Sequence, residues 1–81
     1  MIAYFLDVPE NAGIVRELAR TDGVELSRSG DYHAVSSLRM IELSRQATEC
    51  RLAVWYSAIA GLRDAEIKRH DDDVLWIGPR G

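Results

Sequence analysis

Residues 50–62 read CRLAVWYSAIAGL, and the predicted fold depends on how the chain uses this apolar stretch. Arg51 is its only charged residue, and Ser57 is the only plainly polar residue after Leu52. The uncharged part is too short to span a bilayer, which takes about 20 residues. The stretch is therefore expected to lie in a small hydrophobic core or in a surface that contacts another protein.

The periodicity around this stretch predicts one long helix over residues 38–62, with Ser36 or Ser37 as its cap. At 100° per residue, its apolar side chains form a single stripe. The stripe contains Met40, Leu43, Ala47, Cys50, Val54 and Ala58, broadened by Trp55. Arg51 also falls inside the stripe, so its side chain either extends past the rim to water or pairs with a carboxylate.

The flanking sequence predicts strands and one shorter helix. Short apolar or alternating runs predict strands at residues 2–6, 24–28, 32–35, 63–70 and 74–77. A capping pattern from Asp7 to Glu10 begins a helix through residues 11–20, and Gly23 follows its end. Both tryptophans, Trp55 and Trp76, are expected to be buried. Residues 78–81 are expected to fray.

The predicted element order is β-α-β-β-α-β-β in a single α+β domain spanning residues 1–81. The first strand, helix and strand should form a right-handed parallel crossover. Two hairpins, at residues 24–35 and 63–77, add antiparallel pairs. We therefore expect a two-layer sandwich, with a mixed sheet of about five strands covered on one face by both helices, the second of them long.

The second half of the predicted long helix has lost its charged solvent side. Ala53, Tyr56, Ser57, Ala60 and Gly61 stand there instead, and small residues recur every four positions. The shorter helix is expected to cover only part of this face. The sequence thus predicts a small protein-binding module, either a homodimer or a regulatory subunit or modulator of a larger assembly.

An alternative function is a small nucleic-acid-binding regulator. Arg16, Arg20 and Arg28 would bind phosphates, and Tyr32 on an open sheet face would stack on bases. The formal net charge of −3 weighs against this alternative. The sequence also has no RNP-type motif.

No catalytic motif is present, and enzyme activity is not predicted. Cys50 is the single cysteine, which excludes an intramolecular disulfide and a cysteine-based zinc site. It lies on the predicted core stripe, where a thiol behaves as a small apolar group, so a reactive pair with His33 or His70 is not expected.

Metal, cofactor and small-molecule sites are likewise not predicted. His70 precedes three aspartates at residues 71–73, but consecutive side chains in a turn point in different directions and cap local N–H groups. The N-terminal residues lack the basic region of a signal peptide. A cytoplasmic protein with no membrane association is therefore expected.

Overall fold

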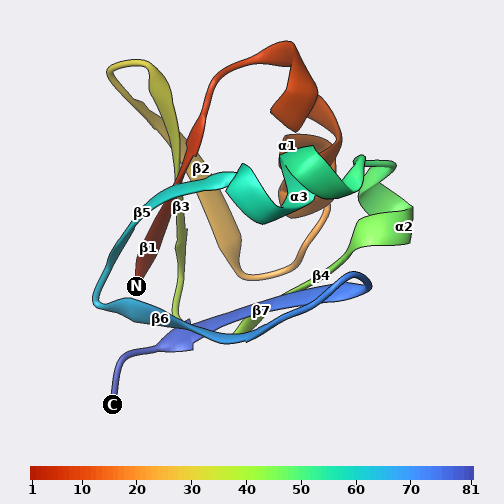
Figure 1. Cartoon of the computed structure of the whole chain (residues 1–81). Helices are drawn as coiled ribbons and strands as arrows, with labels where there is room; N and C mark the ends of the chain where they lie inside the picture. The colour runs from red at the N-terminus through yellow and green to blue at the C-terminus, as the bar shows by residue number, and fades with distance from the viewer.

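The computed structural model describes all residues, 1–81, and shows seven strands in two antiparallel sheets. Sheet A has the strand order β2 (Val24–Ser29), β3 (Tyr32–Ser37), β1 (Ile2–Leu6), β5 (Ile59–Arg63). Sheet B has the order β4 (Ile41–Ser44), β7 (Val74–Pro79), β6 (Ala65–His70). The helices are α1 (Ala12–Ala19), preceded by a 3-10 turn at Pro9–Asn11, and the short α2 (Arg45–Thr48) and α3 (Leu52–Ser57). Figure 1 shows all three helices on one side of sheet A, with sheet B along the bottom of the view.

The predicted long helix over residues 38–62 is wrong. This segment forms β4, α2, α3 and all of β5 except its last residue, Arg63. Glu49 ends α2 in the left-handed region, with φ of 61°, and Arg51 is extended before α3. A straight helix over residues 38–62 would be about 37 Å long at 1.5 Å per residue. The observed molecule extends 29 Å along its longest axis, which is shorter than such a helix.

The predicted parallel crossover and the single mixed sheet are also wrong. β3, rather than β2, is the neighbour of β1, and the two strands are antiparallel with Tyr4 opposite Ala34. β5 pairs antiparallel with the other edge of β1. The apolar strands β1 and β7 each lie in the interior of a sheet, where two neighbours satisfy the backbone N–H and C=O groups on both edges.

Several locally encoded elements are confirmed. β2 and β3 form the predicted hairpin, and β6 and β7 form a second hairpin across the three aspartates. Gly23 has φ of 82° in the turn after α1. β7 continues to Pro79, so the strand includes part of the segment that was expected to fray.

One hydrophobic core joins the helices to both sheets. Its fully buried large side chains are Phe5, Ile14, Leu18, Val35, Ile41, Trp55, Leu75 and Ile77. The predicted burial of Trp55 is confirmed, and its indole Nε1 donates to the carbonyl oxygen of Asp71 at 2.6 Å. Trp76, in contrast, is only half-buried, with the Arg69 guanidinium 5.1 Å from its ring centroid.

Candidate functional site

Sheet A has one face covered by the protein and one face open. Ala3 and Phe5 point into the core, so alternation along β1 directs Ile2, Tyr4 and Leu6 to the opposite side. Figure 1 shows no helix on that side. We call this surface the open face. Its residues are Ile2, Tyr4 and Leu6 of β1, Tyr32, Ala34 and Ser36 of β3, Glu25, Ser27 and Ser29 of β2, and Gly61 and Arg63 of β5.

Apolar and aromatic side chains lie on the two interior strands of the open face, with the most exposed apolar pair at the end of the sheet next to the β2–β3 turn. An antiparallel sheet with one solvated face normally carries polar residues on that face. Leu6 and Tyr32 are instead opposite each other, with 39% and 40% of their surfaces exposed. Glu25 and Arg63 are the charged residues of the open face, and they lie on its two edge strands. Charge is therefore confined to the margins of this surface.

The strand register arranges the open face in rows that cross all four strands. The first row is Glu25, Ser36, Ile2 and Arg63. The second row is Ser27, Ala34, Tyr4 and Gly61. In both rows the large side chain comes from β1 and a small one from β3.

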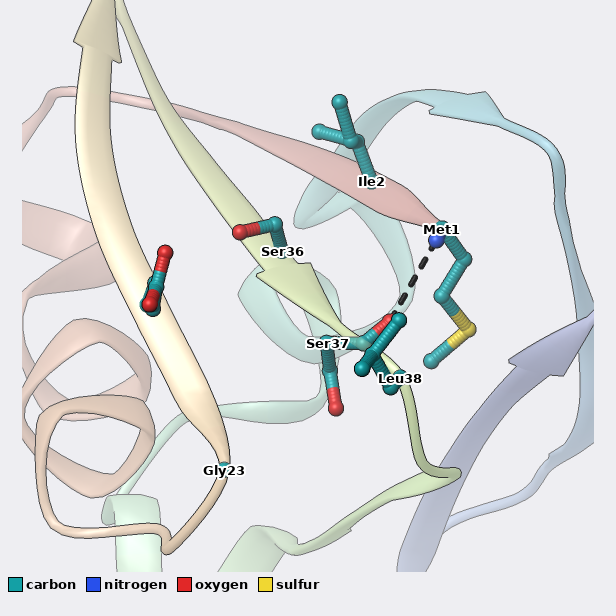
Figure 2. Close-up of a pocket in the computed structure, with 7 residues that line it drawn as sticks. Met1, Ile2, Gly23, Ser36, Ser37 and Leu38 are labelled. Carbon is teal, nitrogen blue, oxygen red and sulfur yellow. Dashed lines mark hydrogen bonds between the residues drawn. The ribbon is translucent and has the colours of Figure 1, made fainter.

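Two hollows lie along the open face. One, of about 350 Å³, is lined by Tyr4, Ser29, Tyr32, Ala60 and Gly61. Ala60 is the extra residue of a β-bulge, because the β1–β5 pairing steps from Gly61 to Ile59. The other hollow, of about 320 Å³, is drawn in Figure 2 and is lined by Met1, Ile2, Gly23, Glu25, Ser36, Ser37 and Leu38. Leu38 at its rim is 97% exposed.

The predicted interface residues fall into two groups. Ala53, Tyr56 and Ser57 are on α3, whereas Ala60 and Gly61 are on β5 and line the first hollow. The four-residue spacing therefore does not place them on one helical stripe. The second group meets Tyr32, which the sequence had assigned to the nucleic-acid alternative.

Tyr56 fixes α3 to the turn between β6 and β7. Its hydroxyl donates to Asp72 Oδ1 at 2.5 Å, and its ring lies 4.8 Å from that of His70. The hydrogen bond to the carboxylate raises the pKa of Tyr56 to about 12. Ser57 donates to the carbonyl oxygen of Ala53 at 2.8 Å. The hydroxyl groups of Tyr56 and Ser57 thus both donate hydrogen bonds to acceptors within the same molecule.

The three arginines of the nucleic-acid alternative lie away from the open face. Arg28 is opposite His33, which is opposite the buried Phe5, so Arg28 points to the helix side of sheet A. It pairs there with Asp7 at 2.5 Å, and His33 Nε2 lies 3.0 Å from the same carboxylate. The hydrogen bonds from Arg28 and then His33 lower the pKa of Asp7. Arg28 and the stacking ring of Tyr32 are therefore on opposite sides of sheet A.

Of the other two arginines, Arg16 is on α1 and Arg20 directly follows its last residue, both on the helix side. Arg16 donates to the carbonyl oxygen of Ala47 at 3.3 Å, and Arg20 pairs with Glu17 at 3.3 Å. Arg51, which fell inside the predicted apolar stripe, is exposed in the structure. Because residues 38–62 do not form one helix, Arg51 does not lie within an apolar stripe.

Asp71 caps the turn that follows His70. Its Oδ1 accepts the backbone N–H groups of Asp73 and Val74, both at 2.9 Å, and its Oδ2 accepts from Arg69 at 2.7 Å. These hydrogen bonds hold the pKa of Asp71 at about 2, and the two backbone N–H donors have the largest effect. No group of three or more His, Cys, Asp or Glu side chains is placed to hold a metal ion. Cys50 is buried as predicted, although it lies between α2 and α3 and not on a helical stripe.

We expect Asp71→Asn to make stability less dependent on pH in acid. The folded pKa of about 2 is below the ordinary aspartate value of 3.8, so the ionised carboxylate stabilises the fold above pH 3.8. That stabilisation is lost as the pH falls from 3.8 towards 2. The variant should therefore be less stable than wild type at pH 7 and show a shallower acid limb in urea unfolding. An unchanged acid limb would contradict this role. Asp73→Asn is the control at pH 7, because the Asp73 side chain makes no hydrogen bond.

Comparison with known proteins finds no match among protein-family models, curated proteins or solved structures. None of the helices has the length and apolar character needed to cross a bilayer. The geometry of the surfaces is therefore the basis for a functional proposal.

Proposed function

We propose that this protein is a small non-catalytic module that binds protein through the open face of sheet A. The observation that carries the proposal is the exposed pair of Leu6 and Tyr32, continuous with Tyr4 and Ile2, on a sheet face that no helix covers. Contiguous exposed apolar surface commonly marks an interaction site. Interface centres are also enriched in aromatic residues and depleted of charge, as this face is.

Protein fits this surface better than nucleic acid does. Single-stranded nucleic acid needs cations beside the stacking rings in order to follow the phosphates. The open face offers Arg63, with Glu25 in the same row. Arg28 faces the other side of the sheet and is already paired with Asp7. The face presents apolar and hydroxyl groups, which suit contact with another protein surface.

We expect Leu6→Glu to abolish protein binding while the fold is retained. An unpaired carboxylate enclosed in an interface costs several kcal/mol. The same charge on a free surface should change stability by no more than about 0.5 kcal/mol. The measurement is capture of tagged protein expressed in its source cells, followed by mass spectrometry, with circular dichroism to check the fold.

Leu26→Glu is the matched control for this experiment. Leu26 is 37% exposed, close to the 39% of Leu6, but it is opposite Val35 and so faces the helix side. Proteins that wild type and Leu26→Glu retain, and that Leu6→Glu loses, would support the open face as the contact surface. Equal retention by Leu6→Glu would refute it.

A further inference from the structure

The order of strands and the positions of charge on the open face identify its partner. Building on the function proposed above, we infer that the partner is a second copy of this chain, packed with its open face against the first. The two copies are related by a two-fold axis that runs along the strands, midway between β1 and β3. Aligned packing of two sheets is a common arrangement, and two-fold symmetry is the commonest in homo-oligomers.

This axis follows from the strand order of sheet A. The midline of β2-β3-β1-β5 lies between β3 and β1. Rotation about an axis along that line, in the plane between the two faces, reverses the lateral order of the strands. It therefore places β2 over β5 of the second copy and β3 over β1 of the second copy. Each row stays at the same height along the strands, so a row faces its own reversed image.

The charges of the first row become complementary under this rotation. Glu25 lies at one end of the row and Arg63 at the other. Reversing the row brings Glu25 over Arg63 of the second copy, and the symmetry generates the same pair again at the opposite edge. Within one copy these residues are three strand spacings apart, about 14 Å, which is too far for a direct ion pair. Charge complementarity of this kind fixes orientation in an interface.

Side-chain size is complementary in the same arrangement. In the second row, Tyr4 faces Ala34 of the second copy, a small side chain that is only 8% exposed within its own copy. In the first row, Ile2 faces Ser36 of the second copy in the same way. Large residues opposite small ones allow two layers to interdigitate. Leu6 faces Tyr32 of the second copy and supplies an aromatic–aliphatic contact.

The other face-to-face arrangement lacks this match. A two-fold axis across the strands would place β2 over β2 of the second copy and would reverse the order of the rows. Glu25 would then face Ser29 of the second copy, and neither Glu25 nor Arg63 would meet an opposite charge. The charged row therefore selects the axis along the strands.

The size of sheet A indicates a reversible dimer. Four strands spaced about 4.8 Å apart and about five residues long span roughly 19 Å by 17 Å. The product of these lengths, roughly 320 Å², is small compared with the roughly 800 Å² that each partner buries in a standard stable interface. The dimer should thus form and dissociate with concentration, and its measurement needs a wide concentration range.

Sedimentation equilibrium with exchanged charges tests this inference. Wild type is compared with Glu25→Arg, Arg63→Glu and the double variant, from about 10 µM to about 1 mM. We expect wild type to form a reversible dimer. Each single variant creates two like-charge contacts and should raise the dimer Kd about tenfold or more. The double variant restores opposite charges across the interface and should return the Kd to within about threefold of wild type. Circular dichroism confirms that each variant is folded.

The outcomes separate this inference from the function on which it depends. A wild type that stays monomeric throughout the range would overturn self-association, while the capture experiment with Leu6→Glu would still decide whether the open face binds protein. A dimer that the single variants do not weaken, or that the double variant does not restore, would overturn the axis along the strands. A dimer lost in Leu26→Glu but retained in Leu6→Glu would show that the two copies contact each other through the helix side of sheet A. That result would overturn the inference that they pack through the open face.

Discussion

Replacing Trp55 with alanine should lower the free energy of unfolding by about 3–5 kcal/mol, the range for large aromatic deletions in cores. The side chain is fully buried at the junction of α3 with sheet B. Its ring meets the His70 ring edge-on at 5.8 Å, and its Nε1 donates to the carbonyl oxygen of Asp71. Alanine would leave both a cavity and a carbonyl group without its donor. For a domain of this length, total stability is only about 4–12 kcal/mol.

Urea unfolding, followed by circular dichroism, measures this effect, and Trp76→Ala is the matched control. Trp76 is only half-buried and stacks against Arg69 rather than in the core. The Trp76→Ala variant should therefore lose less free energy of unfolding than Trp55→Ala. Equal losses in the two variants would contradict the assignment of Trp55 as the central core residue.

Gly13→Ala is expected to destabilise the protein by about 1–3 kcal/mol, the cost of overpacking. In an isolated helix the same change would be favourable by about 1 kcal/mol. The structure reverses the sign because α1 and α2 approach closely at this residue. A Cβ atom on Gly13 would lie 1.9 Å from the carbonyl oxygen of Thr48, so the backbone of one helix would have to move.

Gly61→Ala separates this close approach from the general effect of adding a methyl group. The nearest atom to a Cβ on Gly61 is Tyr4 Cδ2 at 3.7 Å, an ordinary contact. Thermal unfolding should show a much larger loss for Gly13→Ala than for Gly61→Ala. A stabilised Gly13→Ala would show that the helices can separate at little cost.

The open face could not be located from the sequence. Residues 2–6 are apolar at both odd and even positions, and this pattern predicts an inner strand buried on both faces. The strand does lie inside a sheet, but only Ala3 and Phe5 point into the core. The apolar character of Ile2, Tyr4 and Leu6 was the available signal. The same pattern arises whether a chain covers that second face itself or leaves it for a partner.

The helical interpretation of residues 38–62 failed for a related reason. Ile41 and Leu43 alternate with Glu42 and Ser44 as in a half-buried strand, yet Leu43, Ala47, Cys50, Val54 and Ala58 also fit a helical stripe. Both patterns were present, and local sequence did not choose between them. The strand conformation of residues 41–44 is decided by the free edge of β7. Pairing with β4 satisfies the backbone groups of that edge and buries Ile41 beside Ile77.

The sequence alone determined the strand at residues 2–6, helix α1, the two hairpins and the burial of Trp55. Each of these depends on turn residues or apolar character within a few residues of the chain. The predicted capping pattern from Asp7 to Glu10 is wrong, because no side chain caps the 3-10 turn or α1 and the Asp7 carboxylate pairs with Arg28 instead. Only the tertiary structure decided that β5 pairs with β1, that β4 pairs with β7 and that one face of sheet A remains open. These features join segments far apart in the sequence, and their stability comes from burial and backbone pairing that exist only once the whole chain has folded.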